Sequence, residues 1–134
     1  MSTHPDTHER ITRLQQDVEE IKEELQDQWH HKRKEFEERV TKCLTNDSNA
    51  TALFLEIDGE RSMDEIEKAF VTAGKPIPHV SLWRASKKLE GGGLVKKVAI
   101  KGRSPVYAKR PWARALDMDS FVRKEILGQE SASG

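Results

Sequence analysis

The chain has few of the residues that build disulfide networks or membrane-spanning segments. It contains one cysteine, Cys43, one tyrosine and no long apolar run among its 134 residues. A lone cysteine cannot form an intrachain disulfide and is typical of a reducing compartment, and the shortage of apolar runs excludes a membrane-spanning helix. The first ten residues also lack the basic and then apolar pattern of a secretory signal. We therefore expect a cytoplasmic protein.

Net charge is absent from the chain as a whole but not from its parts. The 23 basic residues are balanced by 23 acidic ones. Residues 1–31 and 46–74 each carry −5 and residues 115–134 carry −2, whereas residues 75–114 hold eleven Lys or Arg and one acid, Glu90. Positive charge concentrated in one window of a balanced protein indicates a face that binds a polyanion, most simply DNA.

Glycine and proline are missing from residues 7–44, and this segment is predicted to form one long helix. Its apolar residues first repeat at steps of three and four, as in a heptad, and continue after Leu25 in a shifted register. The stripe consists of Ile11, Leu14, Val18, Ile21, Leu25, Trp29, Phe36 and Val40. A helix of about 54 Å is too long to pack fully on the rest of the chain. We therefore expect a homodimeric coiled coil over residues 7–45, the alternative being a helix that folds back on its own domain.

The second half is predicted to be a compact arrangement of helices followed by a hairpin. Ser62-Met-Asp-Glu65 is a capping box that starts a helix, and Gly91-Gly92-Gly93 ends another. We expect helices over residues 50–57, 62–73, 79–90 and 120–127, and strands over residues 94–100 and 106–108. The fold class is thus mainly α with a small β-hairpin. The compact domain is expected over residues 46–127, with disordered tails at residues 1–6 and 128–134.

The segment from the third of these helices to the hairpin resembles a winged helix-turn-helix. Ser81, Leu82, Arg84 and Leu89-Glu90, followed by Gly93-Leu94-Val95, are similar to the recognition helix and first wing strand of two regulator families. These are the multiple-antibiotic-resistance and arsenic-repressor families. Gly102 to Tyr107 is similar to the wing of many members. The resemblance covers about Ala50–Lys109 and implies DNA binding through the helix and the hairpin.

The residue types in the basic window fit such a role without the resemblance. A helix enters the major groove, where the Arg84 guanidinium can bond guanine O6 and N7 together. Ser81 can donate near the helix N-terminus, Lys87 and Lys88 suit phosphates, and Arg103 at the hairpin tip can clamp the backbone or enter a minor groove. The full candidate set is His79, Ser81, Trp83, Arg84, Lys87, Lys88, Lys97, Lys101 and Arg103. An ordinary solvated face is the alternative for the lysines.

Two tryptophans, Trp83 and Trp112, lie in or next to the basic window. Trp83 either stands exposed on the helix, where it could contact a sugar or a thymine methyl, or folds over Ile77 or the hairpin as core. The sequence leaves these two readings open. Trp112 follows Pro111 and is expected to pack between the hairpin and the last helix.

Other chemistries have weaker signals. His30 and His31 are adjacent and point in different directions on a helix, so a zinc site would need Cys43 from across a dimer. Cys43 is expected to be a small buried hydrophobe rather than a redox switch. The triple glycine follows a helix rather than opening one, unlike a nucleotide-binding loop. We expect no enzyme, no metal, no cofactor and no small-molecule ligand.

The sequence therefore predicts a sequence-specific double-stranded DNA-binding protein, most simply a homodimeric transcriptional regulator associated with the nucleoid. One alternative is an architectural, replication or plasmid-partition factor on the same scaffold. Another is a winged helix that serves as a protein-interaction module.

Overall fold

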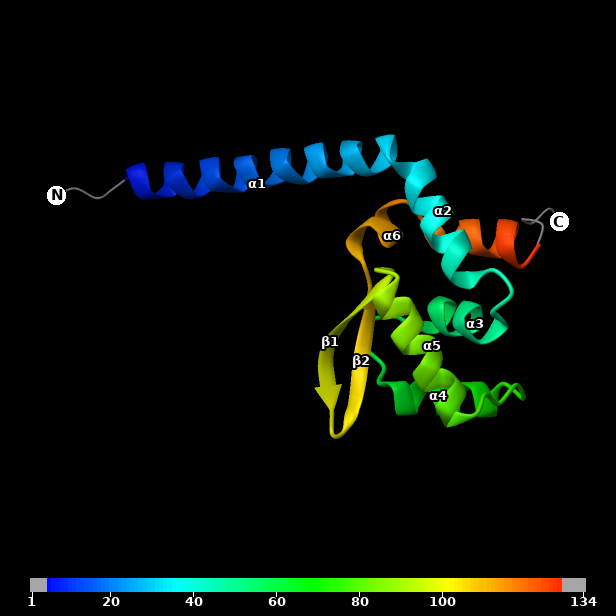
Figure 1. The fold of residues 1–134 in the computed structure, drawn as a ribbon. Helices are drawn as coiled ribbons and strands as arrows, with labels where there is room; N and C mark the ends of the chain where they lie inside the picture. The colour runs from blue at the N-terminus through cyan, green and yellow to red at the C-terminus, as the bar shows by residue number, and fades with distance from the viewer. Residues whose placement is uncertain (1–4, 129–134) are drawn as a thin grey trace.

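The chain folds mainly into helices, with one small antiparallel hairpin, as the sequence predicts. The computed structural model describes residues 5–128, and their side chains from Arg10 onward. A long helix, α1, projects from a compact body that contains the other helices and the hairpin (Figure 1). None of the helices in residues 5–128 is long and apolar enough to cross a lipid bilayer.

The predicted single long helix is wrong, because the segment forms two helices. Helix α1 covers Pro5–His31 and α2 covers Arg33–Leu44, and Lys32 between them leaves the helical region at φ −100° and ψ 14°. The direction of the chain changes at this residue (Figure 1). Because α1 begins at Pro5, the predicted N-terminal tail is shorter than expected. The remaining predicted tails, residues 1–4 and 129–134, lie outside the described residues.

The apolar stripe has two environments: the residues from Ile11 to Leu25 are exposed, whereas those from Trp29 onward contact the core. Val40 is fully buried in the core, and Trp29 and Phe36 are partly buried against it. The Phe36 ring stacks on Trp112, with centroids 4.4 Å apart and planes 10° apart. Trp29, Phe36 and Val40 are therefore corrected from dimer residues to residues that pack within the chain. The compact unit begins in α2, before the predicted boundary at residue 46.

Helix α3, Ser48–Glu56, follows a tight reversal of the chain. Asn46 has a positive φ of 61°, and the Asp47 carboxylate accepts a hydrogen bond from the backbone N–H of Ala50 at 3.0 Å. Four of the nine residues in α3 are buried, including Leu53 and Phe54. Helix α3 packs against α5, the helix of the basic window, and so supports it from the core side.

Helix α4, Met63–Thr72, begins with the predicted capping box. The Glu65 backbone N–H donates to Ser62 Oγ at 3.2 Å, and the Ser62 backbone N–H donates to Glu65 Oε1 at 3.0 Å. Gly74, with φ of 78°, takes the chain out of the helix. After Pro78, helix α5 covers His79–Gly91 and buries Leu82, Ala85, Ser86 and Leu89.

The hairpin pairs β1, Val95–Lys101, with β2, Ser104–Lys109. The register shifts between Lys97 and Ala99, so Val98 is a bulged residue with an exposed side chain. Gly102 makes the turn with φ of 62°, a conformation that suits glycine. The backbone N–H of Asp64 donates to the buried Ser104 hydroxyl at 3.0 Å, which fixes the hairpin against α4.

The C-terminal segment closes the body with short turns of helix. These are α6, Pro111–Ala115, α7, Met118–Phe121, and a π-helical turn over Val122–Ile126. Asp117 caps α7 by accepting from the Ser120 backbone N–H. Helix α6 is not predicted from the sequence. It presents Trp112 to Phe36, so Trp112 links the end of the hairpin to α2 as well as belonging to the core cluster that includes Met118 and Val122.

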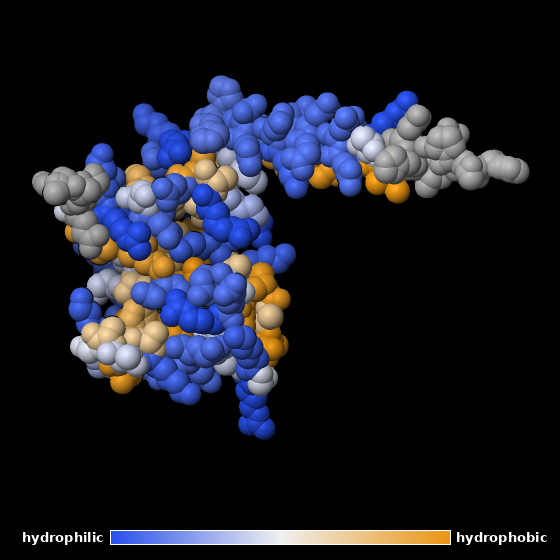
Figure 2. All heavy atoms as spheres, turned by 180° about the vertical axis from the view of Figure 1, so that it is seen from behind, coloured by the Kyte–Doolittle hydropathy of each residue, from blue (hydrophilic) through white to orange (hydrophobic). Residues whose placement is uncertain are grey.

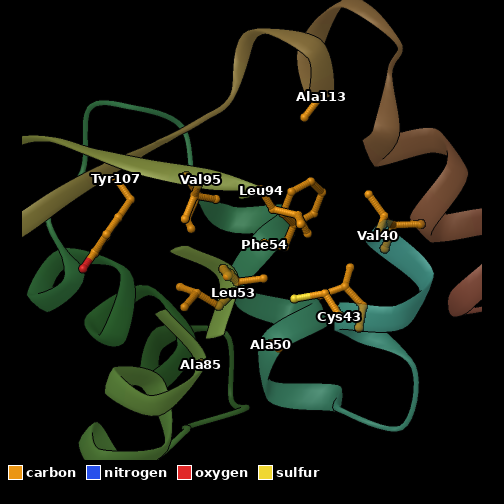
Figure 3. Close-up of a cluster of buried hydrophobic side chains, with 14 of the residues drawn as sticks. Val40, Cys43, Ala50, Leu53, Phe54, Ala85, Leu94, Val95, Tyr107 and Ala113 are labelled. Carbon is orange, nitrogen blue, oxygen red and sulfur yellow. The ribbon is translucent and has the colours of Figure 1, made fainter. Parts of the chain in front are cut away.

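One core holds all these elements together. Figure 3 shows side chains from α2, α3 and the start of the hairpin gathered together, among them Val40, Leu53, Phe54 and Leu94. The Phe54 ring is fully buried, and Lys109 Nζ lies 5.1 Å from its centroid. Because α5 and the hairpin share this core, their relative position is fixed by packing rather than by a flexible linker.

The turn before α4 gives a pH-dependent contribution to stability. Burial alone would raise the pKa of Asp58, but hydrogen bonds from the Arg61 and Glu60 backbone and the Arg61 guanidinium hold it at about 2. A depressed carboxyl pKa stabilises the folded state above pH 4, and this contribution is lost as pH falls toward 2. We expect Asp58→Ala to be less stable than wild type at pH 7. Urea titrations should show the gap closing between pH 4 and 2, and a constant gap would contradict this account.

Candidate nucleic-acid interface

The exposed side of α5 presents basic and aromatic side chains next to one another. Trp83, Arg84, Lys87 and Lys88 are all exposed, because the buried face of the helix takes up Leu82, Ala85, Ser86 and Leu89. Trp83 is 56% exposed, which settles the side that the sequence left open. Lys87 Nζ lies 5.9 Å from the centroid of its ring, within cation–π range. Ser81 is half-buried.

A hollow of about 300 Å³ lies between α5, the start of α4 and the hairpin. Three of the predicted cations, Lys87, Lys97 and Arg103, line it. Its apolar wall includes Trp83, Ile100, Pro105 and Met63. The hollow therefore brings together groups that lie up to 44 positions apart in the sequence, from Met63 to Tyr107. Basic rims around apolar surface suit a ligand that carries both negative charge and flat rings.

Three predicted cations have no ion-pair or hydrogen-bond partner within residues 10–128. They are Arg84, Lys97 and Arg103, all of which are exposed. A fourth, Lys87, has only a long contact of 3.6 Å with Glu90. An exposed cation without a partner keeps its water shell and its charge available to an incoming anion. These four residues are the strongest part of the predicted site.

Three other predicted residues are paired inside the chain. Lys88 Nζ lies 2.9 Å from Asp47, Lys101 Nζ lies 2.9 Å from Glu65, and His79 Nδ1 lies 2.8 Å from Glu67. The Lys88 hydrogen bond lowers the pKa of Asp47. The Ser62 backbone N–H, and then the Lys101 ammonium, hold the pKa of Glu65 at about 2. Exposed pairs of this kind contribute little stability, so an external phosphate can compete for the cation.

Two acidic residues of the hollow were missed by the sequence reading. Asp64 and Glu67 lie one helical turn apart on α4 and line the same hollow as Arg103 and Lys97. Their spacing of three residues predicts a shared helix face, but nothing local predicts that this face meets the hairpin. Val98 and Ile100 were also missed as surface residues, being 51% and 60% exposed on β1. The site is therefore less uniformly positive than the window's charge of +10 indicates.

Metal-ligating groups come together at one place within the described part of the chain. Ligand atoms of Asp64, Glu67 and His79 lie within 4.8 Å of one another, at the edge of the hollow. His79 and Asp64 are exposed, and Glu67 is already paired with His79. Two carboxylates and an imidazole are ligand types that zinc and other transition metals accept. None of these residues is His30, His31 or Cys43, and the sequence predicts no metal site at either place.

Cys43 is buried and has the environment of a core residue. Its Sγ donates a weak hydrogen bond to the Lys88 backbone carbonyl at 3.7 Å. Burial raises the pKa of the Cys43 thiol, although Lys88 opposes the shift. Because the thiolate is the reactive form, this environment disfavours both metal ligation and oxidation at Cys43.

Comparison with known proteins adds nothing to this geometry. No protein-family model, curated protein or solved structure matches the chain. The functional argument therefore rests on the chain's own residues.

Proposed function

We propose that the chain is a sequence-specific double-stranded DNA-binding protein that works as a homodimeric transcriptional regulator. The observation that carries this proposal is the set of unpaired cations, Arg84, Lys97 and Arg103, on a helix and a hairpin held by one core. Three helices followed by a hairpin, with a basic and exposed third helix, support a winged helix-turn-helix. In that arrangement α5 is the recognition helix and β1–β2 is the wing.

Each cation has a separate role in the proposed complex. Helix α5 lies in the major groove, where Arg84 reads guanine and the neighbouring Trp83 contacts a sugar or a thymine methyl. Lys87 and Lys97 bind phosphates on either side of the hollow. Arg103 follows the Gly102 turn at the tip of the hairpin and reaches the backbone or a minor groove. Lys88, Lys101 and His79 contact DNA only if each exchanges its carboxylate partner within the chain for a phosphate.

The exposed stripe on α1 supports a dimer. Ile11, Leu14, Val18, Ile21 and Leu25 are each at least 41% exposed in the single chain. Figure 2 shows apolar surface gathered along one edge of the projecting helix. An apolar stripe of this length on an otherwise charged helix is stabilised by pairing, and a second copy supplies an identical stripe. Two copies would present two α5 helices to one duplex.

A protein-interaction module is the second candidate, and two observations favour it. The acidic pair Asp64 and Glu67 lies inside the proposed DNA surface, where it would repel phosphates. The exposed apolar residues Val98 and Ile100 on β1 suit a protein partner better than a polyanion. An architectural, replication or partition factor would use the same DNA contacts. A footprint distinguishes it, since a regulator protects short discrete sites and a structural factor protects extended ones.

Binding to duplex DNA over a salt series tests the proposal. Each phosphate contact lowers the slope of log K against log salt by about 0.9, where K is the association constant. Four contacts, one for each of Arg84, Lys87, Lys97 and Arg103, therefore give a slope of roughly −4 per protomer. Fluorescence anisotropy with a labelled pool of duplexes measures this slope. Absence of duplex binding at low salt, or a slope near zero, would exclude the DNA function and favour the protein-interaction module.

Single substitutions separate the two kinds of contact. Arg84→Ala should weaken binding to a selected site by about tenfold and relax the preference for its base, because a bidentate guanine contact is lost. Arg103→Ala should weaken binding to all sequences alike and make the salt slope shallower by about one. Arg123→Ala, an exposed arginine beyond α7, is the matched control and should bind like wild type.

A further inference from the structure

We infer that α1 pairs with α1 of a second copy in parallel and in register. The inference rests on the proposed dimer and adds its geometry. Helix α1 meets α2 and α6 of its own chain, and its side chains from Arg10 to Gln28 are all exposed. The stripe from Ile11 to Leu25 is open to solvent, and the next apolar residue, Trp29, is already packed on the core. The partner helix is therefore limited to the segment before Trp29.

The apolar layers favour the parallel arrangement. In a parallel pair each stripe residue packs against its own counterpart, so all five form apolar layers. Ile11 and Val18, two of the three residues that alternate with Leu14 and Ile21 along the seam, are β-branched, and in a parallel coil β-branched residues there favour two helices over three or four. In an antiparallel pair, residues of the first set, Ile11, Val18 and Leu25, instead pack against residues of the second set, Leu14 and Ile21, of the partner. Two registers allow this. The first leaves Leu25 without an apolar counterpart, and the second places Ile11 against the partner's Gln28.

The charges beside the seam favour the same arrangement. In the parallel register Asp17 faces the partner's Lys22, and symmetry gives this attractive pair twice. One antiparallel register sets Asp17 against the partner's Glu24 twice. The other sets Asp17 against the partner's Asp17, although it also pairs Arg10 with the partner's Glu24. Lys22 now contacts Glu19 at 3.5 Å, and both side chains are more than 60% exposed, so Lys22 is free to turn to a partner.

The parallel sense has a direct consequence for the proposed function. Helix α1 has 27 residues and is about 40 Å long. A parallel pair places both compact bodies at the same end of the coil, so the two α5 surfaces can meet neighbouring turns of one duplex. An antiparallel pair would hold the bodies at opposite ends of the helices, and the two surfaces could not read adjacent half-sites.

Disulfide trapping in the full chain tests the orientation. In a Cys43→Ala background, Ile11→Cys and Leu25→Cys chains are oxidised separately with oxidised glutathione. The parallel arrangement predicts a covalent dimer from each chain alone, because the two cysteines share one layer. In either antiparallel register the same cysteines are at least about 15 Å apart, too far for a disulfide. Mixtures of Ile11→Cys with Ile21→Cys or Gln28→Cys would then cross-link instead, which would overturn the inference.

A charge substitution is an independent test, because it changes the dimer affinity differently in the parallel and antiparallel arrangements. Asp17→Lys lies outside the seam and should weaken the dimer by about tenfold in sedimentation equilibrium, because two attractive pairs become repulsive. Adding Lys22→Asp should restore the affinity. In the antiparallel registers Asp17→Lys would tighten the dimer or leave it unchanged, and either result would overturn the inference. A wild-type chain that sediments as a monomer would exclude the proposed dimer itself, whereas an antiparallel dimer would exclude only its orientation.

Discussion

Trp112→Ala should lower the free energy of unfolding by about 3–5 kcal/mol, the range for truncating a large buried aromatic side chain. Trp112 is 6% exposed and joins α6 to α2 through its stack on Phe36. The Arg39 guanidinium carbon lies 5.5 Å from the Phe36 ring centroid and 5.8 Å from that of Trp112, so the substitution also removes a cation–π contact. The packing contacts that the substitution removes are those between α6 and α2.

Urea unfolding followed by circular dichroism measures this change, since it does not depend on tryptophan fluorescence. Trp83→Ala is the matched control, because Trp83 is the same residue type but is 56% exposed. It should change stability by no more than about 0.5 kcal/mol. Equal losses in the two variants would contradict the assignment of Trp112 to the core and of Trp83 to the surface.

Leu14→Asp combined with Ile21→Asp should convert the dimer into monomers, with an affinity at least about 100-fold lower. Each substitution places an unpaired carboxylate in the apolar seam, and 100-fold corresponds to only about 2.7 kcal/mol. Both residues are exposed in the single chain, at 62% and 56%, so the folded monomer has no reason to lose stability. Sedimentation equilibrium should show the change in mass. Affinity for a two-half-site duplex should fall with it, because the second contact becomes intermolecular.

Gln16→Asp combined with Gln26→Asp is the control for added charge. These residues lie outside the stripe on the same helix and are exposed, so they introduce two carboxylates without entering the seam. We expect this variant to remain a dimer. If both double variants keep the wild-type mass, the stripe is not the dimer interface. If both become monomers, charge on α1 rather than the seam decides assembly.

Local signals in the sequence predict much of the fold. The capping box of Ser62 and Glu65 and the helix end in Gly91-Gly92-Gly93 each depend on a few neighbouring residues, and the structure confirms both. The bend at Lys32 has no such signal, since the segment lacks glycine and proline. Around the bend, Trp29, Phe36 and Val40 pack on the body, while the stripe from Ile11 to Leu25 does not. That is a tertiary preference that helix propensity does not contain.

The candidate site was predictable in composition but not in detail. The charge of the window identifies α5 and the hairpin, and helical periodicity separates Leu82 and Leu89 from Arg84 and Lys87. The pairs Lys88–Asp47 and Lys101–Glu65 join residues 41 and 36 positions apart, so only the tertiary fold reveals that these cations are engaged. The sequence could not decide whether the Trp83 side chain is buried, because a helix face beside a hairpin can be either covered by the hairpin or exposed. In the structure the hairpin does not cover Trp83, and its side chain is exposed.

The most direct test of the proposed DNA surface is nuclear magnetic resonance of the ¹⁵N-labelled chain as a short duplex is added. The account predicts that the largest backbone amide shifts fall in His79–Lys88 and Lys97–Arg103, with smaller shifts in the rest of the body. It predicts that the shifts fade as salt is raised, because phosphate contacts carry the binding. Shifts confined to α1 or to the C-terminal turns, or no shifts at low salt, would contradict it.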